Sequence, residues 1–173
     1  MLRDFEREIL PMARHFGMAQ APWDVLGCGK FQTKEQVAER KKKGQSPRSV
    51  FSGDTTANQT QDEIRMNEAL AKVVEEHGIK SVTAIALAYV LSKAPNVFPL
   101  AGGRKIDHMQ DNIQALKIKL TDTQAKHLES VRSFDIGFPG NFIGVDPKVS
   151  GKPSSLLAHS SFAICSGSES YRL

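Results

Sequence analysis

"NVFPLAGGRKIDHMQDN", residues 96–112, is the stretch that decides the fold class of this chain. It opens with a short apolar run at 97–101, which reads as a strand, and a helix is predicted from about Asp107. Between the two stand a pair of glycines and a pair of cations, namely Gly102, Gly103, Arg104 and Lys105. A buried strand that passes through such a turn into a helix is typical of α/β proteins.

The four residues of this turn suit an anion. Glycine lets the backbone approach a ligand and adopt positive φ, and the first turn of a helix presents N–H groups without partners. The guanidinium of Arg104 matches a phosphate, and Lys105 adds a point charge. The alternative, on these residues alone, is an ordinary strand-to-helix turn with exposed cations.

Outward from this turn, apolar periodicity predicts a mostly helical chain with one further strand. That further strand is expected at 18–25, where Pro22 stops it. The strand before the glycine turn is expected at 96–101. Ser81 and Thr121 are expected as N-caps because their hydroxyls can accept first-turn N–H groups. Pro11 lies inside the first predicted helix, and a proline at an interior position usually kinks or breaks a helix. The predicted helices cover residues 4–16, 34–42, 62–77, 81–94, 107–116 and 120–133.

The order of these elements indicates an α/β architecture with parallel strands. Only two strands are evident, and two strands cannot form a stable parallel sheet, since both faces and both edges need cover. The helix at 81–94 is almost entirely apolar and should be buried. We therefore expect some apolar helix faces to be left uncovered and one strand edge to be left unpaired.

The chain divides by composition into a folded region, 1–147, and a tail, 148–173. Eight of the last 24 residues are serine and no periodicity persists there, so the tail is predicted to be disordered. The polar connection over 30–61 contains a basic run at 39–48. That run is interpreted as a solvated loop, with an anion contact as the alternative.

Bulk composition excludes several classes of protein. The chain is 40% hydrophobic and 24% charged, and its net charge of +4 is too dispersed to favour nucleic acid. No apolar run has the length of a membrane span, and the charged N-terminus is not a signal peptide. Cys28 and Cys165 give neither a disulfide framework nor a metal-ligand spacing. A cytoplasmic protein without a metal site is expected.

Three segments resemble successive pieces of an aldo-keto reductase, and the nearest branch is that of the fungal aryl-alcohol dehydrogenases and norsolorinic acid reductase. They are "RDFEREILPMARHFGMAQAPWDVLGCGKF" (3–31), "SVTAIALAYVLSKAPNVFPLAGGRKIDHMQDNIQALKIKLTDTQAKHLESV" (81–131) and "FDIGFPGNFIG" (134–144). The resemblance covers about residues 3–147. It implies the C-terminal part of a (β/α)₈ TIM barrel, truncated and followed by the disordered tail.

The resemblance also implies an NADP site. In this family the segment after the last barrel strand grips the 2′-phosphate and adenine, which here implicates Gly102, Gly103, Arg104 and Lys105, with His108 and Asn112 toward the adenosine. The segment after the seventh strand lies along the pyrophosphate. The residues implied there are Trp23, Asp24, Val25, Leu26 and Gly27, with Cys28 and Gly29 close behind.

The family's reaction needs an Asp, a Tyr, a Lys and a His from the first barrel strands, and the Tyr gives the carbonyl oxygen its proton. The resemblance begins after the sixth strand, so no residue here is assigned a catalytic role. Tyr89 is expected to be a buried packing residue and Cys28 a filler of the turn.

By resemblance, the function is NADP(H)-dependent interconversion of alcohols with aldehydes or ketones, represented by a truncated chain that is inactive alone. A non-catalytic remnant and a module that requires a partner are the alternatives. The expected substrates of full-length relatives are small carbonyl compounds or alcohols. Nucleic acid and membrane are not expected partners, whereas self-association or pairing through the open barrel edge is.

Overall fold

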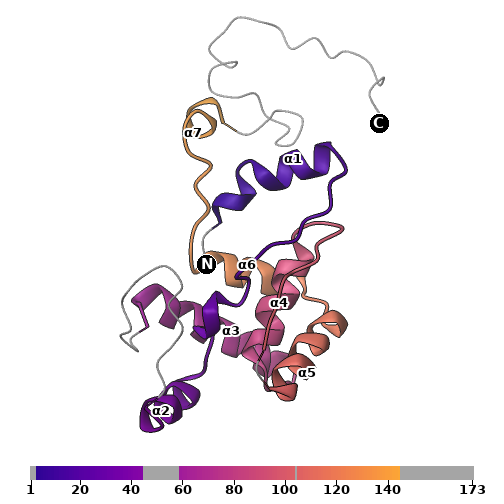
Figure 1. The fold of residues 1–173 in the computed structure, drawn as a ribbon. Coiled ribbons are helices and arrows are strands. Elements are labelled where there is room, and N and C mark those ends of the chain that lie inside the picture. Colours follow the sequence, from indigo (N-terminus) through magenta and orange to yellow (C-terminus); the bar gives the residue numbers. More distant parts are fainter. Residues whose placement is uncertain (1–2, 45–58, 104, 145–173) are drawn as a thin grey trace, which may run out of the picture. The chain divides into compact units, whose positions relative to one another are not determined.

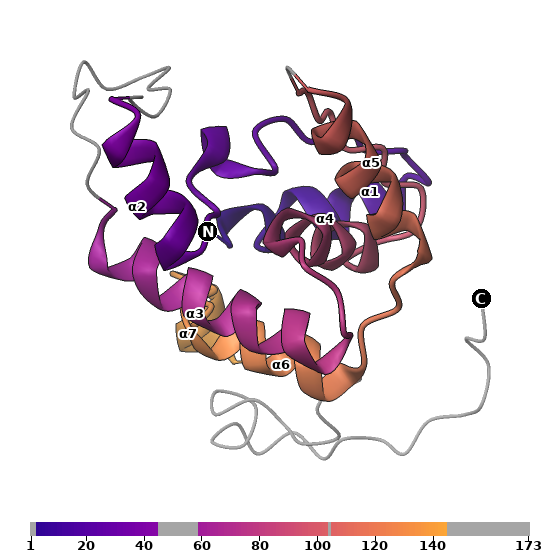
Figure 2. The same cartoon turned by 90° about the horizontal axis from the view of Figure 1, so that it is seen from below.

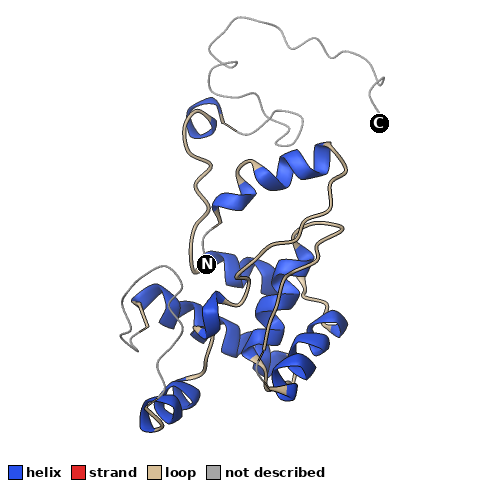
Figure 3. Ribbon diagram, viewed as in Figure 1, coloured by secondary structure: helices blue, strands red, loops and turns tan. Residues whose placement is uncertain are grey.

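The computed structural model describes residues 3–44, 59–103 and 105–144, and within these ranges every regular element is a helix (Figures 1 and 3). None of the described helices is both long and apolar enough to cross a lipid bilayer. In chain order the elements, with η for a short 3₁₀ turn, are η1 (Asp4–Glu6), α1 (Ile9–His15), η2 (Gly27–Gly29), α2 (Lys34–Lys42), α3 (Gln61–Glu76), α4 (Val82–Ser92), α5 (Ile106–Gln114), η3 (Ala115–Lys117), α6 (Asp122–Ser130) and α7 (Gly140–Ile143).

Most of the predicted helices are confirmed, together with the side chains expected to cap them. The bounds of α2 are those predicted, and α3, α4 and α6 lie within the predicted ranges to about one turn. Ser81 Oγ accepts the N–H of Ala84 at 3.2 Å. Thr121 accepts the N–H of Gln124 at 3.2 Å, and the Gln124 side chain accepts the N–H of Thr121 at 3.0 Å. These reciprocal bonds form a capping box, which fixes the start of α6.

The first predicted helix, over 4–16, is broken into η1 and α1, and Pro11 accounts for the break. An unbroken helix from Asp4 would need the Pro11 nitrogen to donate to the carbonyl of Arg7, and proline has no N–H. Because α1 begins at Ile9, Pro11 falls in its first turn, where an N–H would lack a helical partner in any case.

The expectation of two β-strands, at 18–25 and 96–101, was wrong, although the two segments do pair in parallel. A single bridge joins Gln20 and Val97. The next bond of this ladder would need an N–H at Pro22, so the pairing stops short of a strand. Three main-chain hydrogen bonds make the pairing: Gln20 N to Asn96 O at 3.0 Å, Phe98 N to Gln20 O at 2.7 Å and Leu100 N to Pro22 O at 2.9 Å.

The main core lies between α3, α4 and α6, which run close together in both views (Figures 1 and 2). Leu70 and Val73 of α3 and Ile85 of α4 have no exposed surface, and Leu128 contributes from α6. A second apolar cluster, Ala84, Leu87 and Ala115, occupies another face of α4. Because α4 is covered on two faces, its uniformly apolar sequence is explained, and the predicted burial of this helix is confirmed.

Exposed apolar side chains remain on α5 and on the second paired segment. Ile106, Met109 and Ile113 recur at helical spacing and are 76%, 62% and 46% exposed. Phe98 and Leu100 of the second paired segment are 62% and 57% exposed. An apolar stripe of this kind on a helix commonly marks a surface that contacts another surface. The expectation of uncovered apolar faces is confirmed.

Two compact units divide the chain, and the first ends at Phe134. The second unit contains α7, and every other element belongs to the first. Residues 45–58 of the long connection and the predicted disordered tail, 148–173, lie outside the described residues. The domain boundary predicted at 147 therefore stays a prediction.

Candidate functional site

The two loops that carry the predicted site residues start at the same end of the paired backbone. Trp23 directly follows Pro22, and Gly102 lies two residues beyond Leu100. The bond from the Leu100 N–H to the Pro22 carbonyl, 2.9 Å, is the last that the structure forms between the two segments. Parallel segments end on the same side, so two loops that are far apart in the sequence start as neighbours.

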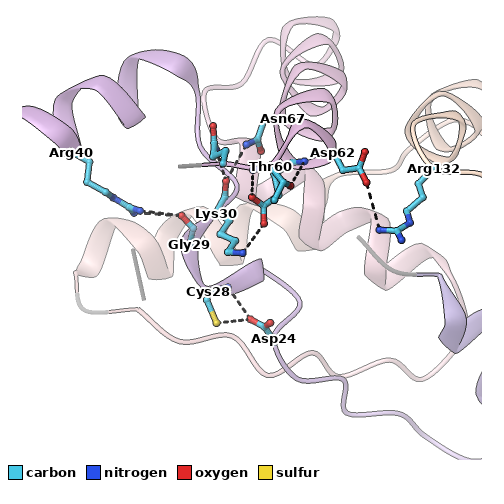
Figure 4. Close-up of polar contacts among 11 residues, drawn as sticks. Asp24, Cys28, Gly29, Lys30, Arg40, Thr60, Asp62, Asn67 and Arg132 are labelled. Carbon is cyan, nitrogen blue, oxygen red and sulfur yellow. Dashed lines mark hydrogen bonds and ion pairs between the residues drawn. The ribbon is translucent and has the colours of Figure 1, made fainter. Parts of the chain in front are cut away.

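The first of these loops, residues 23–29, has an unusually coiled backbone. Two non-glycine residues adopt left-handed φ angles, Asp24 at 55° and Cys28 at 53°, and Gly27 and Gly29 do so as well. Such a conformation costs a non-glycine residue on the order of 1–3 kcal/mol, so neighbouring contacts must hold it. Asp24 Oδ1 accepts the Cys28 N–H at 2.8 Å and the Cys28 thiol at 3.1 Å (Figure 4).

Side chains of this loop divide into two roles. Val25 and Leu26 pack against the cluster around Ala84 and Leu87 of α4, so they anchor the loop to the helix. Trp23 is 57% exposed at the start of the loop. In the predicted pyrophosphate segment, Trp23 and Asp24 are therefore the exposed residues, while Val25 and Leu26 are half-buried and pack against the protein.

The downstream end of the loop is fixed to the start of α3 through Lys30 (Figure 4). The Lys30 carbonyl accepts Asn67 Nδ2 at 3.0 Å and Gln59 Nε2 at 2.9 Å. Its ammonium group pairs with Glu63 Oε1 at 2.7 Å. No local spacing in the sequence indicates these contacts, because Lys30 is about 30 residues or more from Gln59, Glu63 and Asn67 along the chain.

In the second loop, the two glycines differ. A Cβ added at Gly103 would lie 2.7 Å from the Cβ of His108, whereas at Gly102 it would meet nothing within 4 Å. Neither glycine has a positive φ, so left-handed freedom is not the reason for either. Gly103 is required because the loop passes close to α5. Arg104 lies outside the described residues.

The start of α5 offers donors and positive charge. Lys105 is the N-cap residue, and its side chain makes no capping hydrogen bond, so the first-turn N–H groups have no side-chain cap. Such a helix start favours an anion, although Asp107 in the first turn opposes it with its own charge. The pKa of Glu39 on α2 lies below its ordinary value because Lys43 donates to it and, more weakly, because Lys105 lies near.

His108 and Asn112 follow along the same helix. They are four residues apart on α5, so their side chains share one face. His108 is exposed and lies against Gly103, and Asn112 is half-buried. Gly103 thus lies against His108, and Asn112 follows one turn further along α5.

A charged cluster that sequence analysis did not find surrounds Lys93. The Lys93 ammonium contacts Glu129 and, at 3.2 Å, Glu6, and it lies 4.6 Å from the centre of the Tyr89 ring. Arg3 pairs with Glu6 at 2.7 Å. Three separate segments meet here, so no sequence spacing could have revealed the cluster.

Tyr89 belongs to this cluster and not to the two loops. It is 4% exposed, as expected of a packing residue, and its hydroxyl donates to Glu129 Oε1 at 3.4 Å. Burial raises the pKa of Tyr89 above its ordinary value. Since α4 ends at Ser92 and the paired segment starts near Asn96, the cluster lies at the beginning of the paired backbone and the loops lie at its end.

Comparison with known proteins finds close relatives. The profile of the Aldo/keto reductase family matches residues 1–133. Probable aryl-alcohol dehydrogenase AAD4 of Saccharomyces cerevisiae is 63% identical over 158 residues, which cover 91% of this chain and 47% of that protein. Aldo-keto reductase ausK of Aspergillus calidoustus is 52% identical over 156 residues, which cover 90% of this chain and 38% of that protein.

The chain spans about half the length, or less, of these relatives. It covers 96% of another yeast homologue that is 62% identical. Among solved structures, the glycerol dehydrogenase AKR11B4 of Gluconobacter oxydans is similar with a TM-score of 0.59 and 22% sequence identity. That likeness covers 80% of this chain and 43% of the dehydrogenase, and at this identity it concerns the fold alone.

Proposed function

Because the chain belongs to the Aldo/keto reductase family, we propose that it carries part of the NADP(H) site of an oxidoreductase that interconverts alcohols with aldehydes or ketones. The family implies a TIM-barrel fold, and its members act on small carbonyl compounds or alcohols and typically use NAD(P)H. One observation supports the proposal above others: the two loops implied for NADP leave the same end of the paired backbone. In barrels of this kind, ligand sites lie in the loops at the C-terminal ends of the strands.

The residues present fit a phosphorylated dinucleotide. A helix start without a side-chain cap, the cation Lys105 and the close passage of Gly103 are the features that bind a phosphate through main-chain N–H groups. Two adjacent cations, Arg104 and Lys105, suit the 2′-phosphate of NADP, whereas a carboxylate at this point would suit the free ribose hydroxyl of NAD. His108 and Asn112 would hold the adenosine, and the main chain of 23–29 would lie along the pyrophosphate.

When bound, NADPH supplies the hydride that reduces a carbonyl carbon. The residues of this chain would then bind and orient the cofactor. Val25 and Leu26 keep the first loop against α4, and Lys105 would neutralise phosphate charge.

The proton donor that the family resemblance implies is a tyrosine, and we assign no described residue to that role. Tyr89 is the one tyrosine in the described ranges, and its hydroxyl is committed to Glu129 at the opposite end of the paired backbone. A proton donor must reach the substrate oxygen and have a pKa suited to the working pH, and the raised pKa of Tyr89 moves it the wrong way. We propose that this chain alone binds the cofactor and does not turn over.

Calorimetric titration with NADPH and with NADH tests the proposal. NADPH should bind about tenfold more tightly than NADH, a difference of about 1.4 kcal/mol, and Arg104→Ala should remove the preference. In a parallel assay with an aromatic aldehyde, NADPH absorbance should stay constant. Equal affinity for both nucleotides would reject the phosphate assignment, and steady consumption of NADPH would reject the absence of a proton donor.

A second candidate function is a module that works only in association, and the apolar stripe on α5 favours it. Ile106, Met109 and Ile113 form that stripe, and the paired segments offer an open backbone edge. This candidate is compatible with cofactor binding, because the residues of the stripe are not those assigned to the cofactor. Its test is the association experiment given in the Discussion.

A further inference from the structure

Main chain directly after the coiled loop is bonded to the first turns of α3. The carbonyl of Lys30 accepts two amide donors, Asn67 Nδ2 at 3.0 Å and Gln59 Nε2 at 2.9 Å. A carbonyl oxygen has two lone pairs, so these two bonds fill its capacity. Asn67 is only 8% exposed and the bond is partly buried, so water replaces it only in part when it is lost. The position of residue 30 is therefore set by α3.

A second tie acts through the side chain of Lys30. Its Nζ lies 2.7 Å from Glu63 Oε1, and the other carboxylate oxygen of Glu63 accepts the Thr60 N–H at 2.8 Å. Because Glu63 is part of the capping box that starts α3, its carboxylate is already oriented before it meets Lys30. The salt bridge therefore joins the loop to a fixed point of the helix.

The loop itself needs such support. The bonds from Cys28 to Asp24 close it internally, but they do not attach it to the rest of the chain. Two non-glycine residues in it hold left-handed φ angles, which persist only where the surroundings impose them. Attachment comes upstream from the packing of Val25 and Leu26. Downstream it comes from the contacts of Lys30 and from Arg40 of α2, whose guanidinium donates to the Gly29 carbonyl at 3.4 Å (Figure 4).

From this geometry we propose that Asn67 and Glu63 are positioning residues for the loop 24–29. They act through Lys30 and hold the loop in the shape in which it covers NADP(H), without contacting the cofactor themselves. The inference rests on the proposed function, since it is that function which gives the loop a ligand.

The test compares Asn67→Leu, which keeps the volume and removes the amide donor, with the unaltered chain. Acrylamide quenching of Trp23, the only tryptophan, reports the exposure of the loop without any cofactor. NADPH titration reports the site. We expect a larger quenching constant and an affinity for NADPH about tenfold weaker, the change produced by the loss of one buried hydrogen bond.

Val73→Ala serves as the matched control, because it removes core volume from the same helix at a fully buried position that makes no hydrogen bond to the loop. It should lower the melting temperature and leave both quenching and affinity unchanged well below the melting range. If Asn67→Leu gives the quenching and the affinity of the unaltered chain, the inference is overturned. If it shifts them only as much as Val73→Ala, the role is structural and the inference is again overturned.

Two further outcomes need separate measurements: a variant that does not fold, and an unaltered chain that does not bind NADPH. Should Asn67→Leu fail to fold, Glu63→Gln replaces it, because glutamine preserves a capping box and removes the charge that pairs with Lys30. The same direction of change is expected, and no change overturns the inference. If the unaltered chain does not bind NADPH, the proposed function fails. The quenching comparison, which needs no cofactor, then decides alone whether α3 holds the loop.

Discussion

Single residues in the turn carry distinct physical requirements, and the two glycines show it. Gly103 passes so close to His108 that an added Cβ would lie 2.7 Å from the Cβ of that histidine, and Gly102 has open space. The sequence suggests the same role for both, because a glycine pair gives no sign of which member is crowded. Only the path of α5 past the turn separates them.

Gly103→Ala should therefore destabilise the chain by about 1–3 kcal/mol, the range for overpacking a site that cannot yield, since the start of α5 would have to move. Gly102→Ala is the matched control and should change the free energy of unfolding by less than about 0.5 kcal/mol. Urea unfolding of the two variants measures both. Equal effects would show that the approach of Gly103 to His108 is not a constraint.

Glu6 gives the chain a pH-dependent stability. Burial acts to raise the pKa of this carboxyl, but hydrogen bonds from Arg3 and Lys93 outweigh it and hold the pKa below its ordinary value. A carboxyl with a lowered pKa stabilises the folded chain above its unfolded pKa, and that stability is lost as the pH falls through the folded pKa.

The free energy of unfolding should therefore decline as the pH is lowered from about 6 to about 3, and less steeply in Glu6→Gln. Urea unfolding at several pH values measures the slope. Glu8→Gln changes an exposed neighbour on the same segment and should keep the slope of the unaltered chain. If the free energy of unfolding of Glu6→Gln has the same pH slope as that of the unaltered chain, Glu6 does not cause the pH dependence.

At the scale of elements, local signals predict the helices and fail for the strands. Ser81 and Thr121 cap the helices that the sequence assigns to them, because a cap depends on residues within one turn. The first helix is broken because of Pro11. The sequence shows this proline, but whether it kinks the helix or sets its start depends on where α1 begins. Strand pairing depends on neighbours and on donors such as the one missing at Pro22, so apolar runs alone overstate it.

Cap strength can be measured at α6. Thr121→Ala removes the acceptor of the Gln124 N–H and should cost about 1 kcal/mol in the free energy of unfolding. Thr123→Ala alters an exposed position on the same helix and should be close to neutral. Urea unfolding with far-ultraviolet circular dichroism compares the two, and a neutral Thr121→Ala would contradict the capping box.

At the scale of the whole molecule, the chain leaves apolar surface without cover. Family membership implies a barrel, yet the described residues hold one parallel bridge, and α5 keeps an exposed stripe. The sequence predicts this imbalance from the count of strands. It does not predict which side chains are left exposed, since burial depends on how α3, α4 and α6 pack, and it could not place Lys30 and Asn67 together.

The exposed stripe should make the chain associate with itself. Sedimentation velocity over a range of protein concentrations should show mass-action association, and Met109→Lys should weaken it by placing a charge in the centre of the stripe. Gln110→Lys adds the same charge at an adjacent exposed position on another face and serves as the control. A monomer at all concentrations, or equal effects of the two variants, would reject the stripe as a contact surface.

The most direct test of the central claim, that this chain carries part of an NADP(H) site, is titration with NADPH while the emission of Trp23 is followed. Trp23 starts the coiled loop and is the only tryptophan in the sequence. We expect saturable quenching by NADPH that requires higher concentrations with NADH and in Lys105→Ala. A chain with folded helices, as judged by circular dichroism, whose Trp23 emission shows no saturable response to NADPH would contradict it.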